Sequence, residues 1–147
     1  MREILFRGKR ADNGEWIEGM LLKCTLAAGT AYLMFADSFA TDLLGNVHAL
    51  DHAMVDPETV GQFTGLLDKD GRRIFEGDIV RMYIGEGERS IAVYAMIQWH
   101  PNGPCLRDRE TDIFVSFKDA SFARDAPRIW EVIGNIYDNP DVLEVEP

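Results

Sequence analysis

The stretch GRRIFEGDIVRMYIG, residues 71–85, decides how the chain is expected to fold. A charged turn leads into an aromatic residue, then into Glu76, Gly77 and Asp78, and finally into a run of β-formers. Gly77 lets the backbone bend sharply, and the Asp78 carboxylate is placed to accept hydrogen bonds from nearby backbone N–H groups. We therefore predict a turn that leads into a strand over residues 79–84, with an architectural role and no chemical one.

Strand patterns continue on both sides of this stretch. Residues 3–24 indicate two strands joined at residues 11–14, because Asn13 and Gly14 accept the positive φ angles of a tight hairpin turn. Apolar residues alternate along residues 91–99, which predicts a strand with one buried face. Further extended segments are predicted over residues 30–36, 59–64, 112–117 and 128–140. Residues 37–56 show no clear pattern, and residues 118–126 leave room for one helical turn.

These patterns predict a fold that is mainly β, with little helix. Short strands separated by glycine-containing turns are typical of a small barrel or sandwich, and the C-terminal part has the character of an SH3-like barrel. The best boundary lies near Thr64 and Gly65. It divides the chain into an N-terminal β-hairpin subdomain over residues 1–64 and a barrel-like subdomain over residues 65–147. One single domain over residues 1–147 is the alternative.

Composition limits the classes of protein to which the chain can belong. The 147 residues are 46% hydrophobic and 27% charged, which favours an ordered globule. The net charge of −10 is shared by both halves, so binding to nucleic acid phosphates is not expected. Cys24 and Cys105 form no Cys-x-x-Cys pair, which favours reduced thiols. With no signal-peptide pattern and no long apolar stretch, we expect a cytosolic protein without membrane contact.

Two histidines and two aspartates form the first candidate site. His48 and His52 are four positions apart, with Asp51 and Asp56 nearby, and a His pair at this spacing on a helix can bind a metal ion. The Glu of a His-Glu-x-x-His motif is absent, and no other feature of this segment indicates a helix. Surface histidines in an irregular loop are therefore the preferred interpretation, and no metal or cofactor is expected.

Two other pairs invite a catalytic interpretation. Glu76 and Asp78 would act as an acid/base pair only in a cleft that separates their pKa values, and the sequence indicates no such cleft. His100 precedes Cys105 by five positions, but no third residue is indicated that would orient them as base and nucleophile. We therefore assign no catalytic residue.

The aromatic and basic residues also have two interpretations. Tryptophans could form a stacking platform for bases or sugars, but Trp16, Trp99 and Trp130 all lie where alternation predicts core. Basic pairs lie at predicted turns, where solvated charges are ordinary; if folding gathered them on one face, a nucleic-acid site would become possible. These pairs are Lys9 with Arg10, Arg72 with Arg73, and Arg107 with Arg109.

Four motifs occur in order along the chain: REILFRGKR, NGEWIEG, VDPETVGQFTGLLDKDGRRIFEGDIV and EVIGNIYDNP. This ordered set resembles the YopX family, small proteins of phages, prophages and related mobile elements of bacteria. The segment ETVGQFTGLLDKDGRRIFEGDIV is the most specific part of the resemblance. The resemblance implies a mostly β, phage-associated protein, and it supplies no activity and no catalytic residues.

Three functional hypotheses follow. The first is a non-enzymatic accessory protein that binds other proteins or assembles with itself as a homo-oligomer, since small β domains with exposed strands often associate. The second is an acidic inhibitor whose carboxylates imitate the phosphates of DNA and block an enzyme that acts on nucleic acids. The third is a metal-dependent enzyme for small molecules that uses His48, Asp51, His52 and Asp56. We favour the first.

Overall fold

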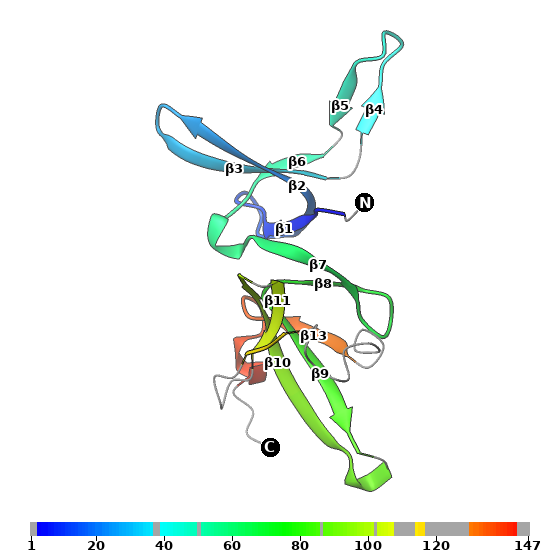
Figure 1. Ribbon diagram of the computed structural model, residues 1–147. Coiled ribbons are helices and arrows are strands. Elements are labelled where there is room, and N and C mark those ends of the chain that lie inside the picture. The colour runs from blue at the N-terminus through cyan, green and yellow to red at the C-terminus, as the bar shows by residue number, and fades with distance from the viewer. Residues whose placement is uncertain are drawn as a thin grey trace. The chain divides into compact units, whose positions relative to one another are not determined.

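The computed structural model describes residues 3–36, 39–49, 51–85, 87–101, 103–107, 114–116 and 130–143. The chain divides into two compact units, Met1–Phe63 and Thr64–Pro147 (Figure 1). Strands dominate both units, and the helical elements among the described residues are short 3-10 turns at Pro57–Thr59 (η1), Gly87–Arg89 (η2) and Pro140–Leu143 (η4). Within those residues no helix has the length and apolar character needed to cross a membrane. The prediction of a mainly β fold with little helix is confirmed.

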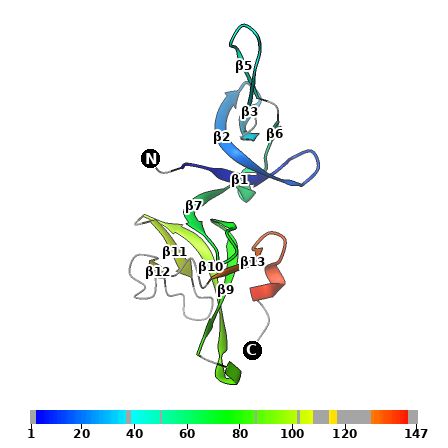
Figure 2. The same ribbon diagram turned by 90° about the vertical axis from the view of Figure 1, so that its right-hand side faces the viewer.

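Antiparallel strands in the order β6-β3-β2-β1-β7 build the first unit, and β7 ends in the second unit beside β8. Their bounds are β1 Phe6–Lys9, β2 Trp16–Leu26, β3 Gly29–Ala36, β6 His52–Met54, β7 Gly61–Leu67 and β8 Arg73–Phe75. A separate two-stranded hairpin pairs β4 (Phe39–Thr41) with β5 (Val47–Ala49). In Figure 1 this hairpin extends away from β2 and β3, and in the view turned by 90° its loop projects beyond β3 (Figure 2).

The turn between β1 and β2 forms where Asn13 and Gly14 predicted it. Gly14 has a φ of 74°, and its backbone N–H donates to the carbonyl of Arg10 over 2.9 Å. The register of the hairpin runs without interruption from Phe6 opposite Gly19 to Lys9 opposite Trp16, so side chains alternate strictly between two faces. One of these faces holds the core of the first unit, which is formed by Ile17, Met34, Ala53 and Val55.

The main sheet of the second unit is antiparallel and has five strands in the order β12-β11-β10-β9-β13. Its strands are β9 (Asp78–Ile84), β10 (Ile91–His100), β11 (Gly103–Arg107), β12 (Phe114–Ser116) and β13 (Glu131–Asn135). The predicted alternation in β10 is confirmed at Ala95 and Ile97, which are buried. Ile91, at the far end of the same face, is exposed.

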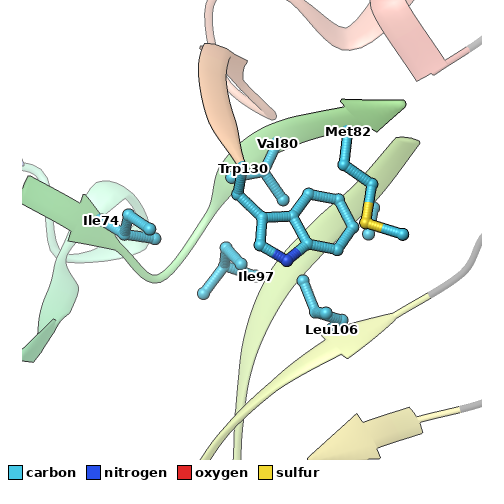
Figure 3. Close-up of a cluster of buried hydrophobic side chains, with 7 residues drawn as sticks. Ile74, Val80, Met82, Ile97, Leu106 and Trp130 are labelled. Carbon is cyan, nitrogen blue, oxygen red and sulfur yellow. The ribbon is translucent and has the colours of Figure 1, made fainter. Parts of the chain in front are cut away.

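A cluster of buried side chains holds the second unit together (Figure 3). Its members are Ile74, Val80, Met82, Ala95, Ile97, Leu106 and Trp130. The indole of Trp130 lies between side chains of β9, β10 and β11, so the residue that precedes β13 packs against three other strands (Figure 3). Burying an aromatic ring of this size removes a large apolar area from water, which makes Trp130 a main stabilising residue of this unit.

Three expectations need correction. Residues 37–56 carry β4, β5 and β6, because strands of three residues are too short to show a periodicity. The last predicted strand contains a register shift between Val132 and Gly134, so its expected alternation is interrupted. The strand orders are open, and the described pairings close neither sheet into a barrel. The helical turn expected over residues 118–126 lies outside the described residues.

Candidate interaction surface

The turn between β8 and β9 contains Glu76, Gly77 and Asp78. Gly77 has a φ of 85°, and its carbonyl accepts a hydrogen bond from the N–H of Ile136 over 2.9 Å. Asp78 is 1% exposed, and its Oδ2 accepts the N–H of Phe75 over 2.7 Å. Gly77 and Asp78 therefore have the backbone roles that the sequence predicted.

A second buried carboxylate, Asp68, was not recognised in the sequence. Its Oδ1 accepts the N–H groups of Asp70 and Arg72 over 2.8 and 2.9 Å, and its Oδ2 accepts the N–H of Val132 over 3.1 Å. Burial raises the pKa of Asp68, but these backbone donors and the Arg72 charge outweigh it and leave the pKa below its ordinary value. The only signal was the Asp-Lys-Asp-Gly turn, which gives no indication that its first carboxylate reaches across to the strand that holds Val132.

The residues of the proposed metal site have separate structural roles. Asp51 Oδ1 lies 3.4 Å from Arg10 Nη1, and the His52 ring stacks on Phe35 with 5.7 Å between centroids. Asp56 caps η1 by accepting the N–H of Glu58 over 3.0 Å. The side chain of His48 lies outside the described residues. Among the residues that the structure describes, no three His, Cys, Asp or Glu side chains are grouped as metal ligands.

Cys105 and His100 occupy different positions in the β10–β11 register. Cys105 lies opposite Gln98, and its Sγ donates to the Gln98 carbonyl over 3.4 Å. Burial raises the pKa of the Cys105 thiol, which disfavours the reactive thiolate. His100 is exposed and lies opposite Gly103. The arrangement therefore gives no support to a nucleophile and base.

The basic residues around the turn between β1 and β2 have ion-pair and cation–π partners. Arg10 binds Asp12 through two hydrogen bonds, Nε to Oδ1 over 3.0 Å and Nη2 to Oδ2 over 2.9 Å. The guanidinium of Arg7 lies 4.8 Å from the Trp16 ring centroid and the Lys9 ammonium 5.5 Å from it. The side chain of Arg109 lies outside the described residues.

The three tryptophans were all expected in the core, and only Trp130 lies there. Trp16 is only half-buried, so its expected core position is wrong, and Trp99 is also half-buried.

An apolar surface that the sequence did not reveal lies on the first unit. The register of β2, β3 and β6 places Leu22, Leu33 and Met54 in one row, with Met20 and Phe35 in the row beside it. All five side chains lie on the face opposite the core of this unit, because their neighbours Leu21, Met34 and Ala53 point to the core. Met20, Leu22 and Met54 are 54%, 48% and 53% exposed. We call these five residues the outer stripe.

The second unit carries an ionic cluster on its surface. Arg81 Nη2 lies 2.7 Å from Glu131 Oε2, and Lys69 Nζ lies 3.7 Å from Glu131 Oε1. The hydrogen bond from Arg81 holds the pKa of Glu131 below its ordinary value, and the positive charges of Lys69 and Arg81 act in the same direction. The guanidinium of Arg81 also lies 5.3 Å from the Tyr83 ring centroid. Each charge in this cluster has an opposite charge beside it, which is typical of a structural surface network.

Comparisons with known proteins give a family and a fold. No curated protein matches the sequence significantly. The crystal structure of protein EF1440 from Enterococcus faecalis is similar, with a TM-score of 0.64 and 21% sequence identity over 97% of this chain and 99% of that chain. At this identity the likeness concerns the fold alone. A family model described as YopX protein matches residues 5–144, which is nearly the whole chain, and the protein therefore belongs to the YopX family.

Proposed function

We propose that this protein is a non-enzymatic accessory protein of phages or prophages, working in the bacterial cytoplasm, that associates with a second copy of itself. The outer stripe carries this proposal. Soluble β-sheets that pack one face against a core commonly present polar side chains on the other face. Here β2, β3 and β6 present Met20, Leu22, Leu33, Phe35 and Met54, with His52 beside Phe35. An apolar row across three strands that is exposed at Leu22 and Met54 is the kind of surface that marks a protein contact.

The free energy available from this surface is moderate. Fully burying a leucine or methionine side chain contributes about 1.5–3 kcal/mol. Because Met20, Leu22 and Met54 are about half covered already, a dimer in which both stripes become covered gains about 4–9 kcal/mol from these side chains. Association costs about 4–15 kcal/mol in lost freedom of motion. The stripe therefore supports association only if further contacts add to it.

The other two functions have less support. A protein that imitates DNA needs open carboxylates gathered on one face, but Asp12 and Glu131 are bound by arginine, and Asp68 is buried. A metal enzyme built on the His48 segment needs its ligands to converge, but Asp51 binds Arg10 and Asp56 caps a turn. Neither function therefore gains an observation in its favour.

Sedimentation equilibrium of the full chain at micromolar concentrations tests the proposal. We expect the wild-type protein to be dimeric and the double variant Leu22→Gln/Met54→Gln to be monomeric, because both substitutions make the stripe polar. The matched control is Ile84→Gln/Ile91→Gln, which removes two similarly exposed apolar side chains from the β9–β10 ribbon and should stay dimeric. A wild-type protein that remains monomeric throughout this range would rule out self-association as its function.

A further inference from the structure

A well-formed turn joins the two strands of the β4–β5 hairpin. Asp42 Oδ1 accepts the backbone N–H groups of Leu44 and Asn46, both over 2.9 Å. Asp42 Oδ2 accepts the Asn46 side-chain amide over 2.8 Å, and Gly45 takes a φ of 83°. One carboxylate thus fixes the path of the backbone around the tip, so the positions from which the side chains of Leu43 and Leu44 project are defined.

Leu43 and Leu44 are the side chains that this turn presents. Their exposures are 106% and 88%, so almost no part of either side chain is covered by the chain itself. Turns at hairpin tips ordinarily carry polar residues, Gly or Pro. Two adjacent leucines held out in this way expose more apolar surface than Met20, Leu22 or Met54 on the outer stripe.

The tip does not cover the outer stripe of its own chain. Both surfaces belong to the first unit, and Leu43 and Leu44 remain exposed while Met20, Leu22 and Met54 remain about half exposed. The hairpin also extends away from β2 and β3 in Figure 1. One chain therefore carries two apolar surfaces that it does not bring together.

We infer that Leu43 and Leu44 at the tip of the β4–β5 hairpin dock on the outer stripe of a second copy, which returns the same contact. This inference rests on the proposed self-association and names its partner surface. A twofold arrangement needs one self-complementary contact and makes it twice, which is the commonest way in which identical chains associate. The two tips supply the additional apolar contact that the stripes lack by themselves, and each tip is fixed by Asp42 before binding, so little ordering is required.

A mixing experiment with two variants of the full chain tests the contact between tip and stripe. The tip variant is Leu43→Ser/Leu44→Ser and the stripe variant is Leu22→Gln/Met54→Gln; all four positions are substantially exposed, and circular dichroism checks that both variants fold. Each variant alone has no intact contact, so its dimer affinity should fall about tenfold or more. An equimolar mixture has one intact contact, from the tip of the stripe variant to the stripe of the tip variant. Native mass spectrometry should therefore show heterodimers well above the share that random pairing of the two variants would give.

The outcomes separate this inference from the proposed function. If the tip variant dimerises as the wild type does while the stripe variant is monomeric, the stripe mediates association but the tip is not its partner, and the inference is overturned. If both variants dissociate but their mixture forms no more heterodimer than random pairing would give, tip and stripe do not contact each other, and the inference is likewise overturned. If the wild type is monomeric, the proposed self-association fails together with the inference.

Discussion

Replacing Asp78 with alanine is predicted to destabilise the second unit through one identified group. The N–H of Phe75 donates to Asp78 Oδ2 over 2.7 Å, and both residues are 1% exposed. Water cannot replace the lost acceptor at this depth, and leaving a buried backbone N–H without a partner costs about 1–3 kcal/mol. We expect Asp78→Ala to lower the free energy of unfolding by at least that amount, out of a total of roughly 5–15 kcal/mol that is ordinary for proteins of this kind.

Two further substitutions make this test specific. Asp78→Asn retains a carbonyl oxygen that can accept from Phe75, so its loss should be smaller than that of Asp78→Ala. Glu76→Gln changes the other carboxylate of the turn, which is half-buried, and should alter the free energy of unfolding by less than about 0.5 kcal/mol. The expected order of destabilisation is Asp78→Ala first, Asp78→Asn second and Glu76→Gln last.

Urea unfolding followed by tryptophan fluorescence measures these differences. A Trp16→Phe background removes the tryptophan of the first unit, so that the signal comes from Trp99 and Trp130 in the second unit. An Asp78→Ala variant as stable as the wild type would refute the architectural interpretation of the turn. An equal loss in Glu76→Gln would also refute it, because the two carboxylates would then act together and not through the Phe75 N–H.

Three other predictions concern single residues. Gly77→Ala should destabilise the second unit by about 1–2 kcal/mol in the same urea assay, because the left-handed backbone is strained for alanine, and the new Cβ would lie 3.1 Å from Tyr137 Cε2. The depressed pKa of Asp68 contributes stability that is present above about pH 4 and is lost as the pH falls through its folded pKa, so Asp68→Asn should flatten the acid side of the unfolding profile. Cys24, two residues along β2 from Leu22 on the same face, should be alkylated more slowly in concentrated than in dilute protein, while buried Cys105 should stay unreactive at both concentrations.

The parts of the fold that the sequence predicted are those where local chemistry alone decides the structure. Asn13 and Gly14 fix a hairpin turn because few other pairs accept its positive φ angles. Gly77 and Asp78 do the same for the turn before β9, where a bend and an acceptor are both needed. The alternation in residues 91–99 revealed β10 because a long strand with one buried face repeats its pattern several times.

The parts that could not be predicted depend on pairing between distant residues. β4, β5 and β6 have three residues each, which is too few for a periodic pattern. The local turn explains two of the hydrogen bonds to Asp68, but the third comes from the N–H of Val132, which lies far away in sequence. Alternation assigned Trp16 to the core, but the register opposite Lys9 places it with two cations on the outer face.

The outer stripe shows why the candidate site could not be derived from sequence. Met20, Leu21 and Leu22 are all apolar, so either face of β2 could have been the buried one. The register settles this point, since Leu21 lies opposite Met34 on the core side and Leu22 lies opposite Leu33 on the other side. A shift by one residue would exchange the two sets. The described residues of the first unit supply a core on one face of the sheet only, so three side chains of the outer stripe stay about half exposed. The proposed self-association would cover these side chains.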